Sequence, residues 1–303
     1  MTIALTGATG FVGQAVLDEA ERRGLSVSAL TRREQPARSN VTWVEGSLSD
    51  TASLHRLCEG ATSVLHVAGL TNTPDPATFE AANVGGTVSV LEGARAARIK
   101  RLVFVSSLSA REPGLSAYGA SKAKAEAVVE QSGLDWTIVR PPGVYGPRDV
   151  DYFEMFRTAK LGFVPLPPRG ASSIIHVDDL ARLLLDLVDA EPALVRRRMF
   201  EPDDGRDGGW SHGELATAIG AAVNRRVFAP NLPKAVLEGA ARIDRLVRGD
   251  KARLTADRVG YMCHPNWVAR SGKRVPEAVW TPQIPGDEGL AQTAEWYRRE
   301  GWL

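Results

Sequence analysis

The chain of 303 residues has few cysteines, almost no excess of charge and no long apolar run. Its 37 basic and 36 acidic residues leave a formal net charge of +1, which argues against a general binder of nucleic acid. Its two cysteines, Cys58 and Cys263, form neither a disulfide framework nor a zinc-binding spacing. Because the sequence has no apolar run of about 18 residues and no signal-peptide pattern at its start, we expect a soluble, cytoplasmic protein without a membrane partner.

Short segments rich in Val, Ile and Leu alternate with longer segments of helical spacing in the first half of the chain. This alternation is typical of parallel strands joined by helices, and therefore of an α/β fold. We expect strands at residues 3–6, 25–31, 41–45, 64–68, 102–106 and 136–140. We expect helices at residues 11–23, 76–97 and 116–131.

Proline and glycine become dense after residue 140, as in RPPGVYGP and FVPLPPRG, and this indicates irregular chain. Helical patterns return at 179–189, 215–223 and 235–247. The sequence therefore predicts a Rossmann-type, doubly wound parallel sheet in residues 1–145, to which residues 171–200 return. Residues 146–170 and 201–303 are expected to form a smaller C-terminal lobe that binds the substrate.

The segment TGATGFVG places Gly7, Gly10 and Gly13 between the first strand and the first helix. Glycine permits a tight turn at the first position, close approach of a pyrophosphate at the second, and close packing of helix on strand at the third. The N-terminus of the helix then offers N–H donors and a partial positive charge to phosphates. This segment predicts a dinucleotide-binding turn.

The end of the second strand favours one dinucleotide over the other. Dinucleotide sites selective for NAD carry an acidic residue there, whereas this chain has Arg32 and Arg33, which suit a 2′-phosphate. We therefore favour NADP(H) as the cofactor. Glu34 directly follows the two arginines and keeps NAD(H) possible.

The segment YGASK places Tyr118 and Lys122 four residues apart at the start of a predicted helix, hence on one face. A phenol has a pKa of about 10, and a neighbouring ammonium group should lower that pKa and make the proton transferable. Ser106 and Ser107 end a predicted strand, where a hydroxyl would face the site of an open α/β sheet. The three residue types together predict acid–base chemistry at a carbonyl or an alcohol.

These motifs, in this order, resemble the extended short-chain dehydrogenases/reductases, also called the NAD-dependent epimerase/dehydratase family. HVAG at 66–69, NVGGT at 83–87, VFVSS, RPPGVYGP and IHVDDLA at 175–181 resemble further landmarks of the family. The resemblance implies that Tyr118 is the acid/base, that Lys122 binds the nicotinamide ribose, and that Ser107 binds the reacting oxygen. Ser106 is the alternative for the last role.

The resemblance also implies which residues contact the dinucleotide. They are Gly7, Thr9, Gly10, Phe11, Val12, Gly13, Arg32, Arg33, Ser47, Leu48, Ala68, Gly69, Asn83, Ser106, Tyr118, Lys122, Pro141, Gly143 and Val144. Two positions depart from the family pattern. Ser47 replaces the acidic residue near the adenine, and Gly143 stands where members acting on nucleotide sugars have an asparagine, which disfavours a sugar substrate.

Several polar residues have a simpler structural interpretation. We expect His66 to be packed and hydrogen-bonded, and Arg148, Arg169 and Arg206 to lie on the surface. His176, Asp178 and Asp179 do not form a complete ligand set, so we expect no metal site. Asp178 or Asp179 is expected to be the N-cap of the following helix.

The sequence thus predicts an NADP(H)-dependent oxidoreductase that acts on a ketone or secondary alcohol. Two alternatives stay open: a nucleotide-sugar epimerase or dehydratase that retains its NAD(P), and a non-catalytic NADP(H)-binding subunit or sensor. The family resemblance also suggests a homodimer formed through the helices near 76–97 and 116–131. The substrate itself, a small molecule, is not named by the sequence.

Overall fold

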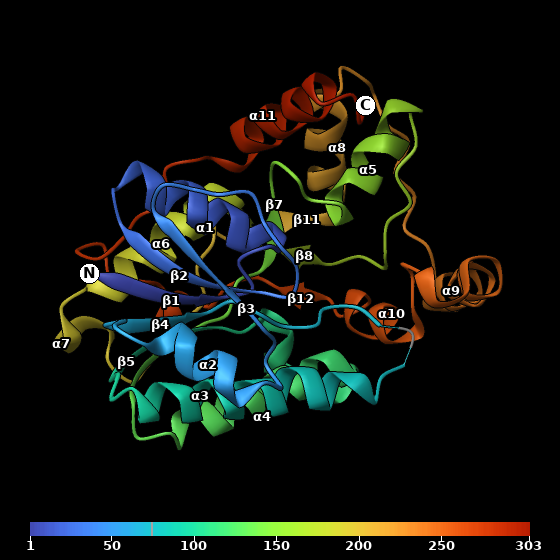
Figure 1. Cartoon of the computed structure of the whole chain (residues 1–303). Helices are drawn as coiled ribbons and strands as arrows, with labels where there is room; N and C mark the ends of the chain where they lie inside the picture. Colours follow the sequence, from blue (N-terminus) through green and yellow to red (C-terminus); the bar gives the residue numbers. More distant parts are fainter. Residues whose placement is uncertain (74) are drawn as a thin grey trace.

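A computed structural model describes residues 1–73 and 75–303 (Figure 1). Its main sheet has seven strands in the order β10-β6-β5-β4-β1-β2-β3, and every neighbouring pair in it is parallel. The strands are β1 (Thr2–Thr6), β2 (Ser26–Thr31), β3 (Val41–Glu45), β4 (Ser63–His66), β5 (Arg101–Val105), β6 (Asp135–Val139) and β10 (Arg198–Phe200). The change of direction between β1 and β4 is the switch point at which such sheets bind ligands.

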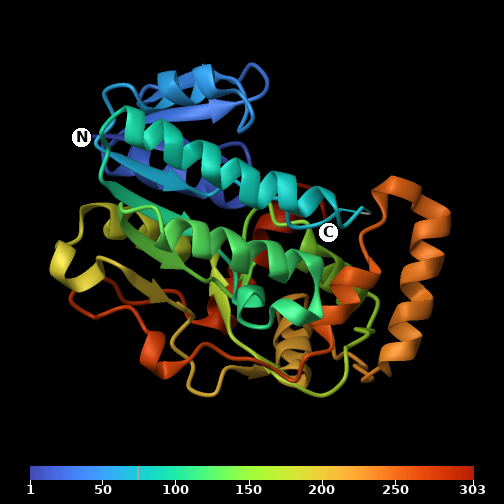
Figure 2. The same cartoon turned by 90° about the horizontal axis from the view of Figure 1, so that it is seen from below.

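Helices cover both faces of this sheet, as Figures 1 and 2 show, so the predicted doubly wound α/β fold is confirmed. On one face, Ile3 and Leu5 of β1 pack with α1 (Phe11–Arg22) and α6 (Val177–Asp189). Ala4 points to the other face, because side chains alternate along a strand, and lies in the core formed with α2, α3 and α4. These helices span Thr51–Cys58, Gly86–Ala96 and Ala117–Glu130.

A third core holds the C-terminal elements together. Phe156, Leu215 and Tyr297 are buried in it and come from α5 (Asp151–Lys160), α8 (His212–Ala222) and α11 (Gly286–Arg299). Two small sheets lie beside it, one formed by β11 (Trp210–Ser211), β8 (Ala171–Ser172) and β12 (Asn266–Trp267), the other by β7 (Gly143–Tyr145) and β9 (Ile174–His176). The other helices are α7 (Pro192–Val195), α9 (Lys234–Arg248), α10 (Ala256–Met262) and the short η2 (Leu108–Arg111), η3 (Pro113–Leu115), η4 (Gly249–Lys251) and η5 (Ser271–Lys273).

Two local predictions need correction. The segment 76–97 is not one α-helix, because a π-helical turn, η1 (Glu80–Gly85), precedes α3. The N-cap of α6 is His176 and not Asp178 or Asp179: the His176 ring accepts a hydrogen bond from the Asp178 amide at 3.2 Å. Asp179 lies within α6, and its buried carboxylate accepts hydrogen bonds from the backbone amides of Gln283 and Ile284, each at 3.0 Å.

Among the helices of the described residues, none combines the length and the apolar character that a membrane span requires. In the same part of the chain, no group of three or more His, Cys, Asp or Glu side chains is placed to hold a metal ion.

Candidate active site

The glycine turn between β1 and α1 depends on the missing side chains. Gly7 has φ of +76°, and a Cβ there would lie 2.6 Å from the backbone nitrogen of Ala68. A Cβ on Gly13 would collide with the carbonyl of Gly7. These two glycines therefore allow the turn and the close packing of α1 on the sheet, as their spacing predicts.

The N-terminus of α1 is open beside Gly10. Gly10 is the N-cap of α1, and a Cβ there would meet only the Gly7 carbonyl, at 3.3 Å. Within the described chain no side chain caps this helix, and its first turn contains no acidic residue. Phe11 and Val12 are the first residues of the helix. The Thr9 carbonyl accepts a hydrogen bond from the side-chain amide of Gln14 at 3.0 Å. The Gly10 N–H is bonded to the Gly7 carbonyl at 3.0 Å, whereas the N–H groups of Phe11 and Val12 have no acceptor within the helix and are suited to bind a pyrophosphate.

Arg32 and Arg33 follow β2 and are exposed. Neither forms an ion pair with any described residue, whereas the nearby Arg38 binds Asp18 and Glu21, each at 2.7 Å. The loop of Arg32 is fixed by the Thr31 hydroxyl, which donates to the Arg33 carbonyl at 2.6 Å. Two unpaired cations at the end of β2 are suited to an additional phosphate.

Lys122, Asn83 and Gly69 lie together at the carboxyl ends of β4 and β5. A Cβ on Gly69 would be 3.4 Å from both the Lys122 Nζ and the Asn83 Oδ1, so these two side chains lie directly beside the Gly69 backbone. The Lys122 Nζ donates to the Val105 carbonyl at 2.8 Å and lies 4.7 Å from the centre of the Phe104 ring. Burial lowers the pKa of Lys122 to about 8.

Tyr118 is only 9% exposed, and its ring lies between Phe79 and Tyr261, at 5.7 and 6.1 Å from their centres. Burial raises the pKa of Tyr118 to about 12, and a hydrogen bond with the Ser107 side chain opposes part of that increase. The pKa of Tyr118 is thus raised and not lowered, contrary to the expectation from the sequence, and the ammonium group of Lys122 is bonded to the Val105 carbonyl of β5.

The two adjacent serines have different partners. The Ser106 hydroxyl donates to the buried carboxylate of Glu126 at 2.5 Å, and Arg140 binds the same carboxylate at 2.6 Å. Ser107 is half-buried, its hydroxyl donates to the Ser109 hydroxyl at 3.2 Å and accepts from the Ser109 amide at 3.1 Å, and its side chain lowers the pKa of Tyr118. This geometry favours Ser107 over Ser106 as the group facing a reacting oxygen.

The remaining predicted contacts are spread around the same region. Leu48 packs on Gly86 of α3, and the Ser47 hydroxyl is bonded to that of Ser49 at 3.0 Å. The Pro141 carbonyl accepts from the Leu108 amide at 3.1 Å, and Val144 lies in β7 against the core. The space in which a side chain on Gly143 would lie is filled by the hydroxyl of Tyr152.

Sequence reasoning missed the residues that reach Tyr118 from the C-terminal part of the chain. The Asp257 carboxylate accepts from the amides of Ala117 and Tyr118, at 2.5 and 3.3 Å, and so caps α4. Tyr261 of the same helix, α10, packs on the Tyr118 ring. No local pattern marks these residues, because about 140 positions separate them from Tyr118.

The structure also places the polar residues that were given a structural interpretation. His66 is buried between Thr6 and Thr87, at 2.6 and 3.1 Å, and its burial lowers its pKa to about 3. Arg169 is exposed. Arg148 and Arg206 are at the surface as well, but each has a carboxylate partner at 2.8 Å, which is Asp18 for the first and Glu214 for the second.

Comparisons with known proteins show the family of this chain. The model of an NAD(P)H-binding family matches residues 7–191. The ceramide reductase of Caulobacter vibrioides is 32% identical over 99% of this chain and 96% of its own length, and the 2-alkyl-3-oxoalkanoate reductase of Stenotrophomonas maltophilia is 29% identical over 96% and 97%. The crystal structure of Thermus thermophilus UDP-glucose 4-epimerase with NAD has a TM-score of 0.71 at 22% identity and covers 98% of this chain and 99% of its own. The chain therefore belongs to the NAD(P)H-binding family, as an NAD(P)-dependent oxidoreductase of the extended short-chain dehydrogenase/reductase type.

Proposed function

We propose that this protein is an NADP(H)-dependent reductase that converts a ketone carrying a long apolar chain into a secondary alcohol. The observation that carries the proposal is that the Tyr118 and Ser107 side chains lie near one another, as the effect of Ser107 on the pKa of Tyr118 indicates, at the end of β5 where the Lys122 Nζ is bonded to the Val105 carbonyl. A phenol and a hydroxyl that share one site are suited to hold and protonate one carbonyl oxygen.

The proposed mechanism uses three side chains. The dinucleotide, held by the glycine turn, Arg32 and Lys122, supplies a hydride to the carbonyl carbon when it is bound. The Ser107 hydroxyl donates a hydrogen bond to the carbonyl oxygen, and Tyr118 donates the proton that converts this oxygen into a hydroxyl. The pKa of Tyr118, about 12, keeps the phenol protonated at neutral pH, and this state is the one that reduction requires.

Two observations support an apolar substrate. The Tyr118 ring is surrounded by the aromatic rings of Phe79 and Tyr261, which offer contact to a hydrocarbon rather than to a sugar. Relatives that align over nearly the whole chain are named as reductases of ceramide and of 2-alkyl-3-oxoalkanoates. We infer that the ketone of this protein's substrate is likewise attached to an alkyl chain.

The two alternative functions have less support. The Tyr152 hydroxyl fills the space beside Gly143, so the position from which sugar-binding members present an asparagine is closed here. A non-catalytic binding subunit would not require Tyr118, Ser107 and Lys122 to lie at one strand end. Retained NAD without any consumption of added NADPH would favour the epimerase instead.

The test is an assay of NADPH and NADH oxidation with long-chain 3-oxo esters and amides. We expect consumption of NADPH and a clear preference for it over NADH. In the double variant Arg32→Ala/Arg33→Ala, the KM for NADPH should rise roughly tenfold to a hundredfold, because bonds between a phosphate and cations are lost, while the KM for NADH stays unchanged. Arg38→Ala is the control, since Arg38 is bound to Asp18 and Glu21. An unchanged preference in the double variant would disprove the assignment of the two arginines.

A further inference from the structure

The helix α9 presents an apolar stripe to solvent. Val236, Ala240, Ile243 and Val247 follow one another at spacings of four, three and four residues, which places them on one face of the helix. Val236, Ile243 and Val247 are 51%, 63% and 77% exposed, and the neighbouring Leu246 is 86% exposed. Single exposed apolar side chains are common on proteins, but a stripe of them over three turns indicates contact with another apolar surface.

An adjacent face of α9 attaches the helix to the rest of the chain. Leu237 and Ala241 are buried there in a small core with Val259 of α10. Figures 1 and 2 show α9 at the edge of the molecule, beyond α10 and away from the seven-stranded sheet. The exposed stripe therefore does not belong to the core of this chain.

Positive charge accompanies the stripe. The helix has four basic and two acidic residues, hence a net charge of +2, and the basic residues are Lys234, Arg242, Arg245 and Arg248. Arg248 pairs with Asp244 at 3.2 Å, whereas Arg242 is exposed and forms no ion pair with any residue that the structure describes. An amphipathic helix that carries Lys and Arg beside a broad apolar face is typical of helices that lie in a membrane interface.

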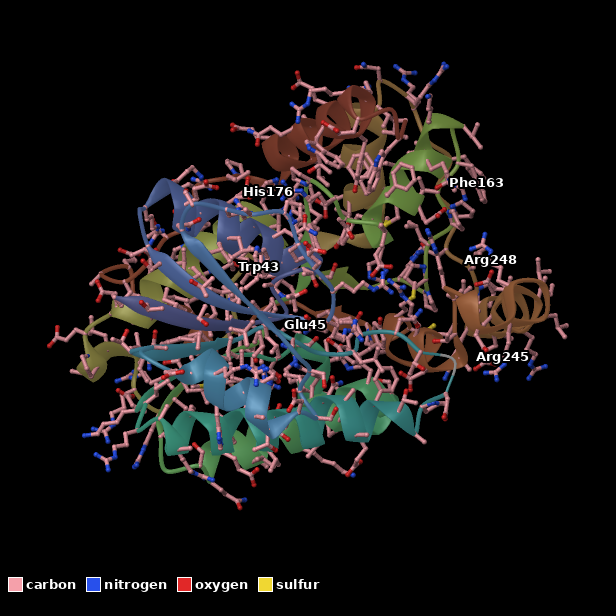
Figure 3. All side chains as sticks on the ribbon, viewed as in Figure 1. Trp43, Glu45, Phe163, His176, Arg245 and Arg248 are labelled. Atoms are coloured by element: carbon pink, nitrogen blue, oxygen red, sulfur yellow. The ribbon has the colours of Figure 1, made fainter. Side chains whose placement is uncertain are left out.

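A second group of exposed apolar residues lies on segments that come before α9 in the sequence. Leu161, Phe163 and Phe228 are 82%, 42% and 70% exposed, and the two phenylalanine rings are 6.1 Å apart. The backbone from Phe228 onward is bonded to the segment after α5 and leads into α9 at Lys234. Figure 3 shows Phe163, Arg245 and Arg248 on the same side of the view.

The apolar stripe is only one helix away from the candidate active site. Val259 of α10 packs under α9, and Tyr261 of the same helix packs on the Tyr118 ring. A surface that contacts α9 is thus close to the residues that we assign to the reaction.

We propose that α9 docks on an anionic membrane surface, with Val236, Ile243 and Val247 among the acyl chains and the basic residues against the headgroups. The charge favours this occupant over a second copy of the chain, because two α9 helices would bring like charges together. This revises the expectation, drawn from the sequence, that no membrane is involved. Docking of α9 on a membrane does not depend on the proposed reaction at Tyr118. Only the further step, in which a ketone dissolved in the membrane reaches Tyr118, rests on the proposed function.

The test is flotation with vesicles of phosphatidylcholine alone or with 30% phosphatidylglycerol, about three in ten lipids being anionic. Wild-type protein should float with the anionic vesicles, and less so as NaCl increases. Ile243→Glu/Val247→Glu should reduce the bound fraction at least about tenfold, since the loss of one buried side chain of this size corresponds to a factor of about ten. Ile243→Leu/Val247→Leu should bind like the wild type. Arg242→Glu should weaken binding, whereas Lys100→Glu, an exposed position before β5, should not.

Three further measurements make the result decisive. Both substituted sites are exposed, so the thermal midpoint of each variant should match that of the wild type. Tyr118→Phe should float like the wild type, which separates docking from catalysis. If wild-type protein ignores anionic vesicles, or if the glutamate variant floats unchanged, the proposal is wrong. A glutamate variant that floats unchanged but turns a dimer into a monomer in light scattering would assign the stripe to a second copy.

Discussion

At the scale of single residues, the chemistry depends on how Tyr118 is kept protonated. Its ring is buried between Phe79 and Tyr261, and this burial raises the pKa of the phenol to about 12. The Ser107 side chain and, to a smaller extent, the charge of Arg258 lower this pKa. A phenol in this state is a proton donor, and this is the state that the proposed reduction of a ketone requires.

Replacement of Tyr118 by phenylalanine should remove this proton and little else. We expect turnover to fall by about 10²- to 10⁴-fold, the usual contribution of a positioned acid, while the Kd for NADPH changes less than about threefold. Steady-state oxidation of NADPH and a fluorescence titration measure the two quantities. Tyr261→Phe, which keeps the neighbouring ring, is the control and should retain activity within about tenfold. A fully active Tyr118→Phe would remove the phenol from the mechanism.

Lys122 gives a pH-dependent prediction for stability. Burial lowers the pKa of this amine from 10.5 to about 8, so between these two values the unfolded chain binds more protons than the folded chain. The free energy of unfolding that Lys122 contributes should therefore rise as the pH increases from 8 to 10.5, by on the order of 3 kcal/mol. Below pH 8 the buried charge should cost the folded state this stability in full.

Urea unfolding of the wild type and of Lys122→Met between pH 7 and 10.5 measures this effect. The methionine variant should gain stability relative to the wild type at pH 7, and the difference should shrink as the pH rises. Lys124→Met is the matched control, because Lys124 lies on the same helix, is exposed and, within the described part of the chain, pairs with the exposed Glu80 alone. A difference that does not vary with pH would show that the pKa of Lys122 is the same in the folded and the unfolded chain, and would contradict the prediction.

At the scale of elements, the sequence predicted those strands and helices that have a local periodic pattern. The strands of the first half were placed to within a residue or two, because a strand buried on both faces has a continuous apolar run, as in VLHVA around β4. The strand β10 was not predicted. It has three residues, the first of them Arg198, and it exists because its backbone pairs with β6.

Contacts between distant elements could not be predicted in the same way. Asp179 resembled an N-cap by its position, but its carboxylate binds backbone amides more than 100 residues away, and His176 became the cap. The same limit applies to Asp257, which caps α4, and to Tyr152, which fills the space beside Gly143. The glycine turn and the Tyr118–Lys122 pair were predictable because their chemistry lies within one turn and one helix.

At the scale of the whole molecule, a buried network of charges joins the main sheet to the C-terminal part of the chain. Glu201 directly follows β10 and is fully buried. Its carboxylate lies 3.4 Å from Arg111 and 3.7 Å from Arg140, and it accepts from the Arg270 amide at 2.9 Å. Arg140 in turn binds Glu126 of α4, the residue that holds Ser106. Through Glu126 and Ser106, the network is thus connected to the end of β5, which Ser107 follows.

The homodimer expected through α3 and α4 involves a different face and stays a prediction. Val88 of α3 is 37% exposed there, so one large apolar side chain of that face is accessible. Light scattering at working concentration decides between a monomer and a dimer.

Removal of Glu201 should destabilise the whole molecule, because it leaves two arginines buried without their shared carboxylate. We expect Glu201→Ala to lower the free energy of unfolding by about 3–5 kcal/mol, the usual cost of breaking a buried ion pair from one side. Glu154→Ala, which removes a carboxylate from partly exposed pairs with Arg157 and Arg253, should cost less than about 1 kcal/mol for each pair. Urea unfolding followed by tryptophan fluorescence measures both variants. Equal losses in the two would mean that Glu201 is no more than a surface charge in energetic terms, and the junction between the sheet and the C-terminal part would then depend on apolar packing alone.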